Sequence, residues 1–250
     1  MNFEPSLGTV VRTAEPALEV YLLGSVDFEA ALALQHRLVF DIASNRSASA
    51  LILCQHPPLI TVGRQGSRAH ILCDGEELRA RRWRVRWVNR GGGCLLHMPG
   101  QMAIYPIFAL DHVGLGVHDY LERLHDVLFA LLDDFNIRGE RRTSQPGIWV
   151  ARRPIASVGV AIRDWVAYFG AALNIHPNLL PFRLVQTAGP TGGTMTSIER
   201  ERHGPLRPAF VRERLLEHFT DRFRISRTSL FFDHPLLKRK APSDALATSS

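Results

Sequence analysis

The chain has 250 residues, which fits one large domain or two small ones and allows a substantial buried core. Hydrophobic residues make up 46% of it and charged residues 22%, and no apolar run reaches the roughly 18 residues of a membrane-spanning helix, so we expect a soluble globular protein with no membrane partner. The net charge of +6 favours acidic partners. Its arginines are scattered and no nucleic-acid motif accompanies them, so no nucleic-acid partner is expected.

The two ends of the chain differ in composition from its centre. We expect a flexible leader over residues 1–17, a single folded domain over residues 18–233 and a disordered tail over residues 234–250. The leader has neither a basic start nor an apolar stretch, which argues against a signal peptide. Three cysteines are too few for a disulfide scaffold, so the expected location is the reducing cytoplasm.

Helical and strand patterns alternate along the chain. Asp27 is a plausible N-cap, and apolar residues at helical spacing follow it up to Ile42. Two more apolar stripes run from Leu121 to Phe135 and from Val211 to Phe223. Strands are predicted at residues 18–23, 50–54, 59–62, 84–89, 102–108, 147–151, 155–162 and 165–175, with residues 84–89 half-buried. Consecutive strands joined by short polar turns indicate hairpins with helices packed on one face, an α+β domain.

A glycine-rich segment at residues 89–101 is the strongest candidate for a binding site. Three consecutive glycines let a ligand approach the backbone, and the guanidinium of Arg90 suits a carbonyl or an anion. His97 follows on the next expected strand, where its imidazole could bond a substrate or a neighbouring residue. The bland alternative is a simple turn followed by a structural histidine.

Three other features carry a weaker signal. Residues 55–66 combine a Pro-Pro break with a glycine turn. Residues 187–197 form a hydroxyl-rich loop before a helix near Ser197, and this loop could bind an anion or be merely flexible. A zinc site is a further hypothesis. Its possible ligands are Cys54, His56, Cys73, Cys94 and His97. They lack paired C-x-x-C spacing, so we expect neither a metal nor any other cofactor.

Taken together, these segments resemble the octanoyl-[acyl-carrier-protein]:protein octanoyltransferases, the lipoyl/octanoyl transferase family. Residues 56–64 read HPPLITVGR, close to the family's H-P-P-x-[YF]-T-[LM]-G-R. Residues 90–101 read RGGGCLLHMPGQ and match R-G-G-x-x-T-x-H-x-P-G-Q except for Leu95 at the threonine. Residues 170–175 read GAALNI, close to the family's G-x-A-L-N-V.

This resemblance implies the fold of lipoate and biotin protein ligases, a mixed sheet with helices on one side, and a tunnel for an eight-carbon acyl chain. The implied partners are octanoyl-acyl-carrier protein and the lipoyl domains of 2-oxoacid dehydrogenase or glycine-cleavage proteins. The implied substrate contacts are Arg90, Gly91, Gly92, Gly93, Cys94, Leu95, Leu96 and His97, then Ser157, Val158 and Gly159, and then Gly170, Ala171 and Ala172.

The residues that carry the family's chemistry are substituted. The resemblance implies a nucleophilic cysteine, where this chain has Ala188, and an activating lysine, where it has Pro154. Phe169 replaces the family's histidine before Gly170. Cys94 could serve as a replacement nucleophile, but its spacing from His97 predicts that the two side chains lie on opposite faces of a strand.

Two functions from different classes follow. One is an octanoyltransferase of protein lipoylation with lost or altered catalysis, which uses Cys94 or aligns the acyl donor and the acceptor lysine for direct transfer. The other is a non-catalytic binding module that holds an octanoyl or lipoyl group, a lipoyl domain or an active paralogue. Loss of both the nucleophile and its activator favours the second. The true ligand, the physiological partner and the oligomeric state are not predicted.

Overall fold

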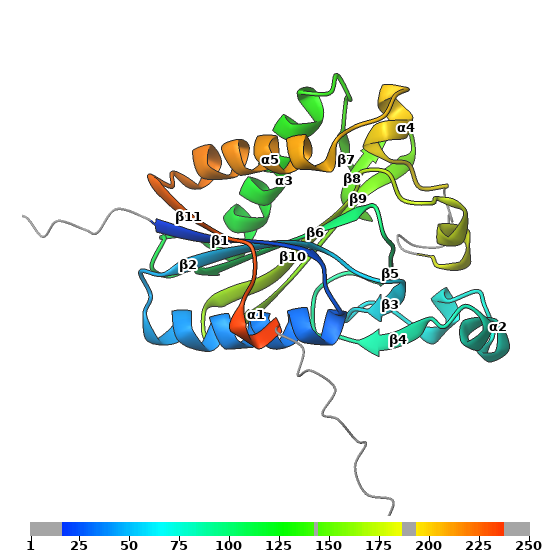
Figure 1. The fold of residues 1–250 in the computed structure, drawn as a ribbon, viewed down its shortest axis with the longest axis horizontal. Helices are drawn as coiled ribbons and strands as arrows, with labels where there is room; N and C mark the ends of the chain where they lie inside the picture. The colour runs from blue at the N-terminus through cyan, green and yellow to red at the C-terminus, as the bar shows by residue number, and fades with distance from the viewer. Residues whose placement is uncertain (1–16, 143–144, 187–193, 238–250) are drawn as a thin grey trace, which may run out of the picture.

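A large mixed sheet forms the centre of the molecule (Figure 1). The computed structural model describes residues 17–142, 145–186 and 194–237. The eight strands are, in sheet order, β11 (Arg227–Phe231), β1 (Ala17–Ser25), β2 (Ser49–Gln55), β6 (Gln101–Ala109), β10 (Val166–Asn174), β9 (Arg153–Arg163), β8 (Gln145–Val150) and β7 (Glu140–Arg142). β11, β1 and β2 run parallel, and all later neighbours are antiparallel.

Two tight turns build the antiparallel half of this sheet. Ala151 and Arg152 connect β8 to β9 with φ of 45° and 71°. Asp164 and Trp165 connect β9 to β10 with φ of 52° and 61°. Two-residue turns with positive φ match the right-handed twist of paired strands. These hairpins confirm the predicted pairing of consecutive strands and the α+β class.

Helices cover both faces of the sheet, so the expectation that they pack on one side was wrong. Helix α1 (Phe28–Ser44) packs below the sheet in Figure 1, whereas α3 (Val117–Asp133) and α5 (Pro208–Phe223) pack above it. The strand β6 is buried along its whole length, and its alternate residues enter the two cores. Ile104 belongs to the α3 and α5 core, and Tyr105 to the α1 core. Hydrophobicity on both faces of a strand requires cover on both.

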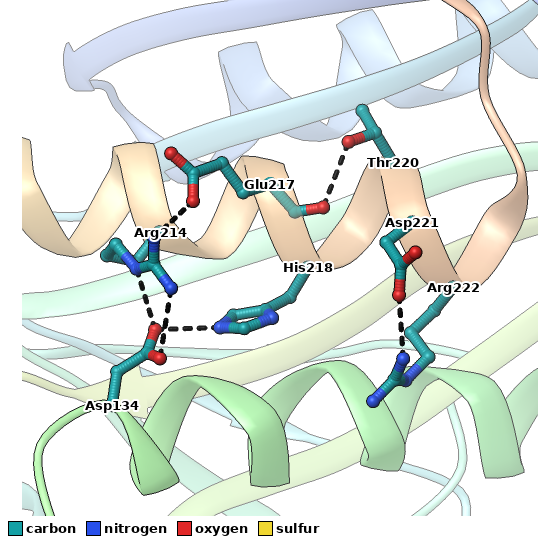
Figure 2. Close-up of polar contacts among 7 residues, drawn as sticks. All are labelled: Asp134, Arg214, Glu217, His218, Thr220, Asp221 and Arg222. Carbon is teal, nitrogen blue, oxygen red and sulfur yellow. Dashed lines mark hydrogen bonds and ion pairs between the residues drawn. The ribbon is translucent and has the colours of Figure 1, made fainter.

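Helices α3 and α5 are also tied together by a polar cluster (Figure 2). The carboxylate of Asp134, directly after α3, accepts hydrogen bonds from Nε and Nη2 of Arg214 at 2.8 and 3.0 Å and from Nε2 of His218 at 2.7 Å. The hydrogen bond from Arg214 is the main cause that lowers the pKa of Asp134. The cluster fixes the end of α3 against the middle of α5.

A small second sheet lies beside the end of the large one. Its order is β4 (Arg84–Trp87), β3 (Leu59–Val62), β5 (Cys94–His97), and it carries the short helix α2 (Gly75–Ala80). Its own apolar cluster includes Ile60, Leu96 and Phe182. The segment predicted as a half-buried strand is instead a largely exposed edge strand, because one side of β4 has no neighbour in the sheet.

The described part of the chain begins at Ala17 in β1 and ends at Leu237. The turn η3 (Pro235–Leu237) lies inside the predicted tail, yet Leu237 packs against the α1 core and the His234 ring lies 5.5 Å from that of Tyr21. The folded part therefore extends a few residues beyond the predicted boundary at 233. None of the described helices is long and apolar enough to cross a membrane.

Candidate functional site

A cavity opens where the small sheet meets strands β9 and β10. About 500 Å³ of space at this place is not filled by atoms, but this includes open solvent, and only about 30 Å³ of it is available to the centre of a water molecule. Its wall is formed by Phe28, Arg90, Gly92, Gly93, Cys94, Leu95, His97, Tyr105, Ser157, Val158, Gly159, Phe169, Gly170, Ala171 and Ala172. Carboxylates are absent from this wall. The cavity is therefore suited to an apolar chain with a polar group that accepts hydrogen bonds.

Three segments far apart in the sequence thus line one cavity, and twelve of the fourteen predicted substrate contacts are among its lining residues. Gly91 and Leu96 are the two predicted contacts that do not line it. Leu96 alternates into the small-sheet core instead. Phe28, Tyr105 and Phe169 line the cavity but were not among the predicted contacts. Phe28 begins α1 directly after its N-cap Asp27, and nothing in its local sequence distinguishes it from an ordinary core residue.

The glycine-rich loop at residues 91–93 is held by backbone hydrogen bonds on two sides. The N–H of Gly63 donates to the carbonyl of Gly93 at 3.0 Å, and the N–H of Gly91 donates to the carbonyl of Val160 at 2.9 Å. A Cβ on Gly159 would lie 2.5 Å from the carbonyl oxygen of Gly91. Gly159 is therefore required because β9 approaches the loop so closely, whether or not a ligand is present.

Arg90 is a buried cation that holds this loop. Its Nη1 donates to the carbonyls of Gly91 and Gly93 at 3.0 and 3.2 Å, and its Nη2 donates to the carbonyl and hydroxyl oxygens of Thr61 at 3.1 and 2.7 Å. Burial lowers its pKa to about 10, so it stays charged at neutral pH. No carboxylate pairs with it among the described residues. Arg90 thus shapes the loop and places a positive charge behind the cavity wall.

His97 is a buried, neutral side chain with one free nitrogen. Its Nε2 lies 3.2 Å from the Thr61 hydroxyl, whose oxygen already accepts from Arg90. Among the described residues, Nε2 is the one acceptor within reach of the hydroxyl proton of Thr61, so Thr61 donates and the His97 proton sits on Nδ1. This Nδ1 is buried and has no partner at ordinary hydrogen-bond geometry among the described residues, although the side chain of Gln101 lies near enough to act on the ring and to raise its pKa. Burial, with the nearby His56 and Arg90, keeps the pKa of His97 well below its usual value.

His56 and Tyr105 form a second hydrogen-bonded chain beside it. Nδ1 of His56 donates to the carbonyl of Val26 at 2.8 Å, which leaves Nε2 to accept from the Tyr105 hydroxyl at 2.9 Å. Burial lowers the pKa of His56 to about 4. The rings of His56 and His97 lie 5.3 Å apart. Two neutral imidazoles thus lie at the cavity, His97 in its wall and His56 beside it, and Nδ1 of His97 has no hydrogen-bond partner among the described residues.

Phe169 stands where the family has histidine, and it forms an aromatic part of the wall. Its backbone has φ of 58°, and its N–H donates to Oε1 of the buried Gln35 at 2.9 Å. Its ring lies 6.1 Å from that of Tyr105, edge to face. A phenyl ring has no titratable group, so it cannot transfer a proton as a histidine could, and it makes this part of the cavity apolar.

The three thiols of the chain are poorly placed for nucleophilic attack. The Cys94 Sγ donates to the carbonyl of Ser67 at 3.3 Å and belongs to the small-sheet core, so it lies on the opposite face of β5 from His97, as its spacing predicted. Burial raises the pKa of Cys94 and of Cys73, and raises that of Cys54 to about 12. A thiol becomes a good nucleophile only as a thiolate. These three would remain protonated.

The two predicted catalytic positions differ in what the structure describes. Pro154 is buried in β9, opposite Trp149, and its carbonyl accepts from the N–H of Thr196 at 2.9 Å. It does not line the cavity. Ala188 lies outside the described residues, as does the loop at 187–193. Arg153, next to Pro154, is ion-paired with Glu201 at 2.9 Å.

The described side chains do not form a metal site. Within the described ranges, no three His, Cys, Asp or Glu side chains come together as a metal-binding group. Two possible zinc ligands do lie close, because Cys54 Sγ is 3.7 Å from His56 Nε2. That nitrogen already accepts from Tyr105.

Comparison with known proteins gives one consistent family. The family model of the lipoyl protein ligase A/B catalytic domain matches residues 27–220. The chain is 34% identical over 204 residues to the octanoyltransferase of Geotalea uraniireducens, covering 80% of this chain and 92% of that protein. It is 39% identical over 182 residues to the octanoyltransferase of Syntrophobacter fumaroxidans, covering 71% and 78%.

Solved structures share the fold at low sequence identity. A putative lipoate protein ligase from T. acidophilum with bound lipoic acid superposes with a TM-score of 0.64 at 15% identity, covering 86% of this chain and 90% of that one. LipL1 of P. falciparum in complex with lipoate has a TM-score of 0.68 at 12% identity, covering 86% and 66%.

Proposed function

Because the chain belongs to the lipoyl protein ligase A/B catalytic domain family, we propose that it acts in protein lipoylation by holding a medium-chain acyl group in the cavity, without forming an acyl-enzyme. The observation that carries this proposal is a cavity lined by three motif segments in a chain that has Pro154 and Ala188 at the positions where the resemblance implies the activating lysine and the nucleophilic cysteine. A site without a nucleophile can hold an acyl group but cannot form an acyl-enzyme.

The wall chemistry fits an octanoyl or lipoyl group. Phe28, Phe169 and Leu95 offer apolar contact for the chain. The Nδ1–H of His97 is unpaired, and a thioester or amide carbonyl is an acceptor that would satisfy it. Arg90, behind the loop, adds a positive potential at the same end. The carbonyl would bind at His97 and the chain along the aromatic wall.

A transferase with altered chemistry is the second candidate. The retained cavity favours it, since alignment of a thioester with an acceptor lysine can accelerate direct transfer without an enzymic nucleophile. Cys94 gives it no support, because its thiol is buried on the other face of β5. The partners would be octanoyl-acyl-carrier protein and a lipoyl domain, as the family resemblance implies. The cytoplasm is the proposed setting, which suits three free cysteines.

The deciding experiment incubates the protein with octanoyl-acyl-carrier protein and apo lipoyl domain, followed by the intact mass of the lipoyl domain. The binding proposal expects no octanoyl gain above a control without the protein. Octanoylation above that control would establish the transferase instead. A parallel titration with octanoyl-pantetheine, monitored by NMR, should show saturable binding, and a His97→Phe variant should bind it more weakly by about tenfold.

A further inference from the structure

The positive charge of the molecule is concentrated in one part of the fold. Residues 57–99, which contain β3, α2, β4 and β5, hold eight arginines and three acidic residues, a net charge of +5. The whole chain carries +6, so all its remaining residues together contribute only +1. An excess of one sign in a region attracts partners of the opposite charge to that region.

Several of these arginines are available to a partner. Arg84 and Arg86 pair with Asp27 and Glu29 at the start of α1, and Arg81 pairs with Glu77. By contrast, Arg64, Arg79 and Arg82 are exposed and have no ion pair with a described residue. Surface cations without local counter-charges can bind acidic side chains of another protein with little competition.

This charged region adjoins the cavity. The N–H of Arg64 donates to the carbonyl of Arg90 at 3.0 Å, and its guanidinium lies close to Gly91. Gly92 and Gly93, the next residues, line the cavity. Trp87 is 59% exposed and pairs with Val62 in the same end of the small sheet. An exposed tryptophan among arginines is the composition of protein-binding surfaces.

We propose that the small sheet, with Arg64, Arg79, Arg82 and Trp87, is the docking surface for an acidic acyl-carrier domain that delivers its acyl group into the adjacent cavity. The inference rests on the proposed function, because the cavity supplies the reason for a carrier to dock there. Acidic carrier domains match the surface in charge, and a tethered acyl group needs a docking site beside the mouth. A protein partner is favoured over nucleic acid, since Trp87 and Leu72 are exposed among the arginines.

The test compares two variants with the same change in net charge. Arg64→Glu with Arg79→Glu reverses the surface, whereas Arg138→Glu with Arg227→Glu reverses two exposed arginines on other elements that also have no ion pair with a described residue. Binding of octanoyl-acyl-carrier protein is titrated at about 50 and 300 mM salt. The first variant should bind about tenfold more weakly at low salt and show a smaller salt dependence, and the second should stay within about twofold of the wild type.

Four further ligands are titrated to decide the identity of the partner and to separate the two proposals. The docking proposal would be overturned if both variants bound the carrier protein equally weakly. It would also be overturned if the surface variant lost affinity for lipoyl domain, duplex DNA or anionic vesicles but not for the carrier. Both variants should bind octanoyl-pantetheine like the wild type. If the wild type itself failed to bind octanoyl-pantetheine, the proposed function would fail, while surface-dependent carrier binding could still be measured.

Discussion

The hydroxyl oxygen of Thr61 lies 3.2 Å from Nε2 of His97 and 2.7 Å from Nη2 of Arg90. One buried hydroxyl thus links the loop-holding cation to the histidine of the cavity wall. It accepts from the first and donates to the second, and this fixes the proton of His97 on Nδ1. The donor that we assign to ligand binding depends on this link.

Thr61→Val should therefore affect both stability and binding. Valine keeps the shape but leaves Arg90 and His97 without the hydroxyl, which should cost about 1–3 kcal/mol of unfolding free energy and weaken octanoyl-pantetheine binding. Urea unfolding and NMR titration measure the two effects. Thr228→Val, on the exposed strand β11, is the matched control and should change neither. If Thr61→Val were as stable as the wild type and bound octanoyl-pantetheine as tightly, the link through Thr61 would have no role.

Stability should fall in mildly acidic solution. Burial lowers the pKa of His56 to about 4, below its unfolded value of about 6.5. Protonation of His56 therefore favours the unfolded chain. The resulting loss of unfolding free energy is absent above about pH 6.5 and grows as the pH falls toward 4. For His56 alone, the loss from pH 7 to pH 5 should be about 2 kcal/mol. His97 shifts in the same direction.

Urea unfolding of the wild type and of His56→Phe at both pH values measures this slope. The variant should lose less stability between pH 7 and pH 5, even though it lacks the bond to Tyr105. His118→Gln, at an exposed position of α3, should keep the wild-type slope. Equal stability of the wild type at the two pH values would contradict the buried neutral imidazoles.

Gly159→Ala should disturb the cavity through the backbone. Its Cβ would lie 2.5 Å from the Gly91 carbonyl, so the loop or β9 must move, at a cost of about 3 kcal/mol. A Cβ at Gly204 would meet nothing within 4 Å, so Gly204→Ala is the control with little expected effect. Thermal unfolding checks both. If Gly159→Ala were fully stable, the requirement for glycine would come from the ligand rather than from packing.

The sequence predicted some features of this molecule from local signals and missed others that depend on packing. Asp27 caps α1 as predicted, because its carboxylate accepts from the Glu29 N–H at 2.9 Å, a contact two residues apart. The separate small sheet was not predicted, since strand partners are chosen by the tertiary fold. Phe28 and Tyr105 come together only because α1 packs on the face of the large sheet to which the side chain of Tyr105 points.

The family pattern named most of the residues that line the cavity, but it did not give the structural reason for each of them. Arg90 was expected to meet a ligand, and the structure has it bound to carbonyls of its own loop and to Thr61. Gly159 was expected to be a substrate contact, and its lack of a side chain is explained by the close approach of Gly91. Such distinctions depend on distances that a motif does not contain.

Restoring both reactive groups should restore chemistry. Ala188→Cys with Pro154→Lys should give detectable acyl-enzyme on exposure to octanoyl-acyl-carrier protein, whereas each single change should do little. A thiol of ordinary pKa near 8.5 is only a few per cent thiolate at pH 7 without the lysine, and the lysine alone has no thiol to activate. Intact mass of the three variants measures this. A folded double variant that stayed unmodified would mean that more than these two residues were lost.

The most direct measurement of the central claim compares native and denaturing mass spectra of the wild-type protein after incubation with octanoyl-pantetheine. The account predicts that the native spectrum contains the protein with one bound ligand and that the denaturing spectrum contains only the unmodified chain. Cys94→Ala should behave identically, since its thiol faces the other side of β5. An octanoyl group that stayed on the denatured chain, or a native spectrum without any ligand, would contradict a cavity that binds the acyl group without reacting with it.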